Sequence, residues 1–141
     1  AGSLSRARGV RALTVVRTVN EWRALRPSMG KLGFVPTMGN LHQGHVSLAE
    51  MSLAECETTA VSIFVNPSQF AAHEDLDRYP VTPESDLEKL DRVGVKYVFM
   101  PSIREMYPSG ITQQLDRQVG AFVELAVRPF SLLLFFYCTF S

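Results

Sequence analysis

The sequence predicts an α/β fold in which helices pack on a parallel sheet. Short apolar runs rich in β-branched residues alternate with segments of helical character, in the order strand–helix–strand–helix–strand. This order favours parallel strands joined by right-handed crossovers. The chain has 141 residues, 46% of them hydrophobic, so it fits one domain, or a large part of one, with a sizeable core.

The chain begins with a predicted strand and helix. Val15 and its neighbour Val16 suggest a short first strand. Asn20 is expected to cap a helix that carries Trp22 and Leu25 and ends before Pro27.

Three further strands and a second helix follow from the pattern of apolar residues. The strands are predicted at residues 31–36, 59–65 and 95–101. The helix is predicted from about His45 to Cys56, with Leu48 and Met51 facing inward.

The last predicted helix has clear start and stop signals. Thr82 is expected to cap it and Pro83 to lie in its first turn, while Glu84 and Asp86 suit the positive end of the helix dipole. Three residues are spaced for one buried face: Leu87, Leu90 and Val93. Gly94 is expected to end the helix.

Composition excludes several classes of function. Seven basic residues against one acid in residues 1–31 balance an acidic remainder, so the net charge is zero and no chain-wide basic face for nucleic acid is expected. Two distant cysteines, Cys56 and Cys138, form neither a disulfide framework nor a paired zinc motif. The longest apolar run, residues 130–140, is shorter than the ~18 residues of a membrane span. Residues 1–12 are interpreted as a basic tail of a cytoplasmic protein, with a mitochondrial transit-like segment as the alternative.

The stretch VPTMGNLHQGHVSL, at residues 35–48, lies where a strand should end and a helix begin. Gly39 permits a tight turn, and Gly44 allows another molecule to approach the backbone closely. The helix start offers N–H groups and a positive dipole end, and the imidazoles of His42 and His45 can donate to phosphate oxygens. A nucleotide is therefore the expected ligand. A metal pair at the two histidines is the alternative, but no nearby cysteine or acid completes a ligand set, so no metal site is predicted.

Four motifs occur in order: PTMGNLHQGHVSL, SIFVNPSQF, EDLDRYPVT and PSIREMYPSG. Together they closely resemble the pantoate–β-alanine ligase family, over about residues 15–124. The resemblance implies a Rossmann-like sheet of the H-x-G-H nucleotidyltransferase type. It also implies a two-step reaction: pantoate and MgATP give pantoyl adenylate and pyrophosphate, and β-alanine then displaces AMP to give pantothenate.

The resemblance also implies site residues. His45 matches the catalytic histidine of the family and His42 its phosphate-contacting partner, whereas Gln69 matches a glutamine that holds pantoate and β-alanine. Asn66 is either a direct ligand or the residue that shapes the turn before Gln69. One wall of the ATP site is implied at eight positions: Met38, Gly39, Asn40, Leu41, His42, Gln43, Gly44 and His45.

Two other segments are interpreted as structural. Residues 75–79 are expected to form a charged surface loop rather than to contact substrate. Arg104, Met106 and Tyr107 are expected in a structural loop after the last strand.

The resemblance divides the chain into residues 13–125, a partial nucleotide-binding domain, and residues 126–141, a divergent apolar tail. Phosphate-binding elements that the family carries further along are not found in this sequence. We therefore expect a truncated family member with impaired activity, and a homodimer as in the family. The alternative is a non-catalytic fragment that binds nucleotide or forms oligomers.

Overall fold

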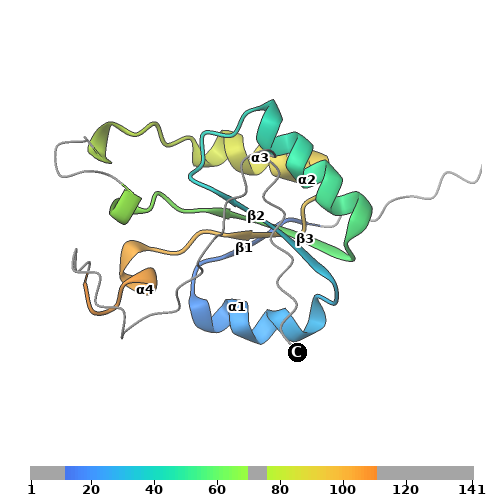
Figure 1. The fold of residues 1–141 in the computed structure, drawn as a ribbon, viewed down its shortest axis with the longest axis horizontal. Helices are drawn as coiled ribbons and strands as arrows, with labels where there is room; N and C mark the ends of the chain where they lie inside the picture. Colours follow the sequence, from blue (N-terminus) through green and yellow to red (C-terminus); the bar gives the residue numbers. More distant parts are fainter. Residues whose placement is uncertain (1–11, 70–75, 111–141) are drawn as a thin grey trace, which may run out of the picture.

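The computed structural model describes residues 12–69 and 76–110. The basic segment before residue 12, the predicted apolar tail at 126–141 and Cys138 lie outside these ranges. The described residues form a parallel α/β structure, so the predicted fold class is confirmed (Figure 1).

The sheet has four strands in the spatial order β1-β4-β3-β2, and every neighbouring pair is parallel. The strands are β1 (Thr14–Val16), β2 (Leu32–Thr37), β3 (Thr58–Ile63) and β4 (Tyr97–Phe99). The helices are α1 (Val19–Leu25), α2 (Gln43–Glu55), α3 (Pro83–Val93) and α4 (Ile103–Met106). Three short 3₁₀ helices are η1 (Arg26–Ser28), η2 (Pro67–Gln69) and η3 (Leu76–Arg78).

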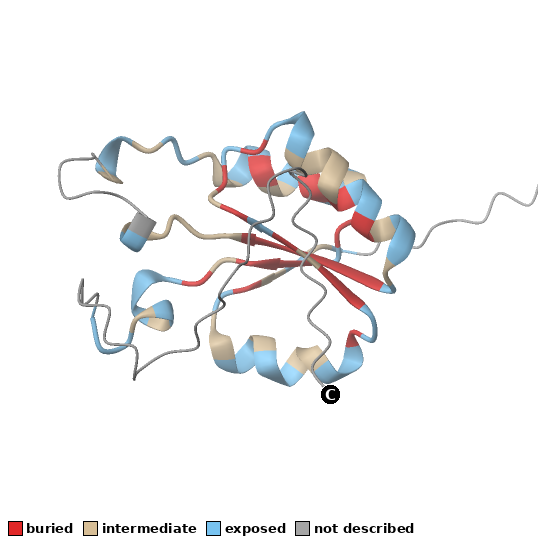
Figure 2. Ribbon diagram, in the orientation of Figure 1, coloured by how far each residue is buried: buried red, intermediate tan, exposed pale blue. Residues whose placement is uncertain are grey.

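Helices cover both faces of the sheet. In Figure 1, α1 lies on one face, and α2 and α3 lie together on the other. On the α1 side, the Trp22 ring packs against Phe34 and Phe99, with centroid distances of 5.6 and 5.3 Å. On the opposite side, Leu90 of α3 joins a buried cluster that includes Val98 of β4. The strands are accordingly the most buried part of the molecule (Figure 2).

The register places the carboxyl ends of all four strands at one edge of the sheet. Thr37 of β2 pairs with Ile63 of β3, and Val16 of β1 pairs with Phe99 of β4. The segments that leave these strands therefore gather at that edge, where parallel α/β sheets bind their ligands. In the described part of the chain, the longest helix is α2 with 13 residues, and no helix could cross a membrane.

The start of α1 differs from the prediction. Thr18, rather than Asn20, is its N-cap: the Thr18 hydroxyl accepts a hydrogen bond from Glu21 N at 3.2 Å. The Glu21 carboxylate in turn accepts one from Thr18 N at 3.3 Å. This reciprocal capping box satisfies two N–H groups, whereas an Asn20 cap would forgo it.

The buried face of α2 also differs from the prediction. Met51 was expected to face inward but is 40% exposed, while Ala49 and Ser52 are fully buried and Leu48 packs at the margin of the core. Gly33 explains this rotation, because a Cβ there would lie 1.8 Å from Ser52 Oγ. Because Gly33 has no side chain, α2 can pack closely on the sheet with its small residues Ala49 and Ser52 facing β2.

Some helix and strand boundaries differ by two residues from the predicted ones. Helix α2 starts at Gln43 rather than near His45, while β3 and β4 are shorter at their carboxyl ends than the predicted 59–65 and 95–101. Pro83 does begin α3, and Gly94 ends it in the left-handed conformation with φ of 101°.

The sheet core should depend on Val98, whose side chain is fully buried in β4. Val98→Ala should lower the free energy of unfolding by about 2 kcal/mol, because it removes two buried methyl equivalents and leaves a cavity. Val81→Ala is the matched control, since Val81 is 69% exposed, and it should change stability by less than about 0.5 kcal/mol. Equal effects in urea unfolding would contradict this assignment of the core.

Candidate active site

The turn between β2 and α2 is held at its first residues by Thr37. The Thr37 hydroxyl donates to Ser62 O at 2.7 Å and accepts from Gly39 N at 3.1 Å, which ties the turn to β3. Gly39 has a φ of 81°, and a Cβ there would lie 3.1 Å from Ile63 Cγ2. Asn40 follows with a φ of 49°. The predicted need for glycine at position 39 therefore has a conformational and a steric cause.

Two backbone N–H groups of this turn bind a buried carboxylate. Asp86 Oδ2 accepts from Asn40 N at 2.9 Å, and Asp86 Oδ1 accepts from Leu41 N at 2.8 Å. The Asp86 side chain is only 1% exposed. From sequence, Asp86 was assigned only to the α3 dipole, so this contact was missed. The available signal was its position four residues before Leu90, which puts a carboxylate on the buried face of the helix.

The side chains of the two histidines accept hydrogen bonds from backbone N–H groups at the start of α2. His42 Nδ1 accepts from Gly44 N at 3.0 Å, and His45 Nδ1 accepts from His42 N at 3.2 Å. The ring centroids lie 4.0 Å apart. The two side chains thus form one unit at the helix start, and one N–H that was expected to be free for a ligand is used by the His42 ring.

Gly44 is required by this arrangement. A Cβ at position 44 would lie 2.7 Å from His42 Cε1, so any side chain would displace the His42 ring. The absence of a side chain therefore serves the packing of the histidine as well as the predicted close approach of a ligand.

The hydrogen bonds determine which ring nitrogens can donate. Because Nδ1 of both His42 and His45 accepts an N–H, the proton of each neutral ring resides on Nε2. Burial lowers the pKa of His45, and neighbouring His42 lowers it further, while the Asp86 carboxylate acts in the opposite direction. His45 is therefore mostly a neutral Nε2–H donor at pH 7.

The predicted ATP-site residues divide into two groups. Leu41 is 3% exposed, its side chain belongs to the core, and its carbonyl accepts from Lys89 Nζ at 2.7 Å. Gly39 is also buried, and Met38 and His45 are partly exposed. The exposed members are Asn40, His42, Gln43 and Gly44. Leu41 and Gly39 anchor the turn, whereas the exposed members are open to solvent.

The second predicted segment leaves β3 at the same edge. Asn66 Oδ1 accepts from Ser68 N at 3.1 Å and from Ser68 Oγ at 2.8 Å, which forms a tight turn into η2, where Gln69 is the last residue. Tyr107 OH donates to the same oxygen at 2.8 Å. These contacts give Asn66 a turn-forming role and give Tyr107, expected in a structural loop, a defined partner.

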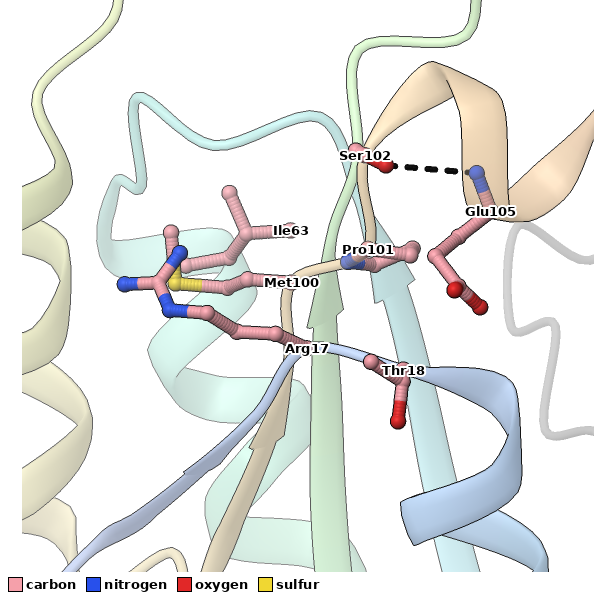
Figure 3. Close-up of a pocket in the computed structure, with 7 residues that line it drawn as sticks. All are labelled: Arg17, Thr18, Ile63, Met100, Pro101, Ser102 and Glu105. Carbon is pink, nitrogen blue, oxygen red and sulfur yellow. Dashed lines mark hydrogen bonds between the residues drawn. The ribbon is translucent and has the colours of Figure 1, made fainter.

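An open pocket of about 440 Å³ lies at the carboxyl ends of β1, β3 and β4 (Figure 3). It is lined by Arg17, Thr18, Ile63, Met100, Pro101, Ser102 and Glu105. Glu105 Oε2 accepts from Val19 N at 3.0 Å and thereby joins α4 to α1. The pocket shares the sheet edge with the histidines, although none of its lining residues was predicted from sequence.

Within the described ranges, no group of three or more His, Cys, Asp or Glu side chains could hold a metal ion. The donors that the turn leaves for a ligand, the two imidazoles at the start of α2, suit an anion. A parallel sheet with an H-x-G-H turn at its carboxyl edge defines a nucleotidyltransferase-like α/β domain.

Comparison with known proteins identifies the family. The pantoate-beta-alanine ligase family model matches residues 11–132. Pantothenate synthetase of Chloroflexus aggregans is 49% identical over 118 residues, and that of Idiomarina loihiensis is 45% identical over 120 residues. This chain belongs to the pantoate-beta-alanine ligase family.

Solved structures agree with this assignment. Pantothenate synthetase from Thermus thermophilus superposes with a TM-score of 0.66 at 46% identity, covering 71% of this chain and 36% of that one. Pantoate-beta-alanine ligase from Francisella tularensis, complexed with beta-gamma ATP and beta-alanine, gives a TM-score of 0.67 at 38% identity, covering 70% and 39%. The matches to the Chloroflexus and Idiomarina proteins cover 83% of this chain but only 43% of each relative.

The lowered pKa of His45 predicts a specific loss of stability in acid. The unfolded chain takes up a proton near the ordinary histidine value, about pH 6.5, whereas the folded protein does so at lower pH. Stability should therefore fall as pH drops through about 6.5. His45→Gln keeps an acceptor for His42 N but does not titrate, so its urea midpoint should fall less between pH 7.5 and 5.5. Identical pH profiles for the two proteins would contradict the prediction.

Proposed function

We propose that the protein joins pantoate to β-alanine at the expense of ATP, through a pantoyl adenylate. The observation that carries the proposal is that Nδ1 of both His42 and His45 accepts a backbone N–H at the start of α2, which leaves Nε2 of each ring for a ligand. Family membership supports the choice of substrates.

In the first step, a pantoate carboxylate oxygen attacks the α-phosphorus of ATP, and the bond to the bridging oxygen of pyrophosphate breaks. His45 and His42 donate to phosphate oxygens, whose negative charge grows in the transition state. Because its pKa is lowered, His45 acts as a neutral donor and needs no change of protonation to bind MgATP. Mg²⁺ enters with the nucleotide phosphates as part of the substrate.

In the second step, the amine of β-alanine attacks the acyl carbon of the adenylate, the bond to the phosphate oxygen breaks, and AMP leaves. Gln69 holds the pantoate portion and the incoming β-alanine, since an amide offers both donors and acceptors. Asn66 shapes the turn at Ser68 that precedes Gln69, and Tyr107 supports this turn. The homodimer and the cytoplasmic location expected from sequence belong to the same proposal.

His45→Ala should lower the rate of pantoyl adenylate formation by about 10²–10³, because a donor to the transition state is lost. His45→Gln is the matched control for folding, since it retains the capping acceptor while the ring is removed. His45→Gln should unfold at a urea concentration close to that of the parent at pH 7.5, and His45→Ala at a lower one because it loses the acceptor of His42 N, while both should lose activity. An unchanged adenylation rate in a folded His45→Ala variant would contradict the catalytic role proposed for His45.

Gln69→Ala should raise the KM for pantoate and for β-alanine by about tenfold, the loss expected for one or two hydrogen bonds, and leave the KM for ATP nearly constant. The reason is that Gln69 follows β3, whereas the histidines follow β2. Steady-state kinetics with each substrate varied in turn measures the difference. A selective rise in the KM for ATP would contradict the role given to Gln69.

The experiment that tests the proposed function is direct. Purified protein carrying this sequence is incubated with ATP, Mg²⁺, pantoate and β-alanine, and pantothenate and AMP are quantified. Formation of both in equal amounts supports the proposal. ATP binding without product would instead favour the non-catalytic nucleotide-binding interpretation.

A further inference from the structure

We propose that Asp86 and Lys89 of α3 are positioning residues, which hold the H-x-G-H turn so that the two histidine rings meet the nucleotide phosphates. This inference rests on the proposed function and deepens it, because neither residue belongs to the predicted set of ligand contacts. It assigns to α3, which begins some forty residues after the turn, a part in the chemistry of the first step.

Both oxygens of the Asp86 carboxylate accept hydrogen bonds from the turn, and one also accepts from Thr82 at the start of its own helix. The carboxylate accepts from Asn40 N and Leu41 N at 2.9 and 2.8 Å, and from Thr82 Oγ1 at 3.2 Å. These two N–H groups belong to residues in and next to a left-handed backbone conformation, so no regular element can pair them. Because Asp86 is 1% exposed, loss of Oδ1 would leave the buried Leu41 N–H without a partner, and loss of Oδ2 would remove the acceptor of Asn40 N–H.

Lys89 binds the backbone of Leu41 as well. Its Nζ donates to Leu41 O at 2.7 Å, so α3 binds both polar backbone groups of Leu41. The Leu41 side chain is 3% exposed and lies in the core cluster with Leu90. The residue directly before His42 is therefore fixed by two hydrogen bonds and by packing, all of which involve α3.

The position of His42 sets that of His45. His42 N donates to His45 Nδ1 at 3.2 Å, and the rings stand 4.0 Å apart. A shift of Leu41 would move the His42 backbone and break this contact. Displacements of about 1 Å at a catalytic group can cost about 10²-fold in rate, so the turn must be held tightly.

Thr82 gives independent support for a role beyond helix stability. Thr82 is the N-cap of α3, yet its hydroxyl does not cap a helix N–H. It donates to Asp86 Oδ1 instead. A residue that usually stabilises a helix start is thus used to orient the carboxylate that binds the turn.

The test compares Asp86→Asn with Val16→Ala in purified protein. Asn has the shape of Asp but replaces one acceptor oxygen by a donor, so it opposes an N–H of the turn. Val16 is 2% exposed and belongs to the core cluster on the α1 side of the sheet, which does not include Leu41, so its replacement lowers stability without removing a contact to the turn. The readouts are kcat/KM for ATP in adenylation and amide hydrogen exchange at Asn40 and Leu41.

Asp86→Asn should lower kcat/KM for ATP by about 10–100-fold and speed amide exchange at Asn40 and Leu41 well beyond the change in global unfolding. Val16→Ala, assayed where it is folded, should keep kcat/KM within about twofold, because Val16 packs in the core cluster on the α1 side, away from Leu41. Parental kinetics and parental amide exchange in Asp86→Asn would overturn the proposal. A loss of kcat/KM in Val16→Ala equal to that in Asp86→Asn would also overturn it.

Lys89→Met keeps the proposal falsifiable if Asp86→Asn fails to fold. Lys89 is only partly buried, so this variant should fold, and it should lower kcat/KM for ATP about three- to tenfold through the lost contact to Leu41 O. Parental kinetics together with parental exchange at Leu41 would contradict the role of Lys89. The exchange readout needs no ligase activity, so absence of pantothenate formation by the parent would refute the proposed function without deciding this inference.

Discussion

The buried carboxylate of Asp86 and the two backbone N–H groups that it accepts determine the geometry of the turn after β2. A tight turn with two consecutive residues of positive φ leaves N–H groups that neither a helix nor a strand can pair. Without an acceptor beneath them, these groups would have to face water, and the turn could not stay close to α3. The carboxylate permits the chain to reverse sharply from the sheet into α2, and this reversal brings His42 and His45 together at the sheet edge.

The small residues of β2 and α2 also help to place the two histidines. Gly33 lets Ser52 approach the sheet, where the Ser52 hydroxyl meets Thr59 Oγ1 at 2.7 Å, so α2 lies close over β2 and β3. Gly44 leaves room for the His42 ring against the helix start. A helix packed in this way presents its first turn at the carboxyl edge, where its dipole and its two imidazoles favour an anion.

The sequence was informative where the signal was local. Strand–helix alternation predicted the parallel sheet, Gly94 predicted the end of α3, and residues 35–48 predicted the turn from a strand into a helix. The sequence did not predict contacts made by residues that are far apart in the chain. Asp86 reaches Leu41 across 45 positions, and Tyr107 reaches Asn66 across 41, and neither contact leaves a periodic pattern. Met51 was misplaced for a related reason, because the rotation of α2 depends on the gap at Gly33 of another element.

Exchange of labelled pyrophosphate into ATP, with pantoate present and β-alanine absent, tests the central claim most directly. If the turn supports adenylation, the first step runs reversibly without the amine, and label should enter ATP only when pantoate is present. His45→Ala should reduce the exchange in proportion to its loss of adenylation. Label that fails to enter ATP with pantoate, or that enters only when β-alanine is added, would contradict an adenylate formed at the histidine pair.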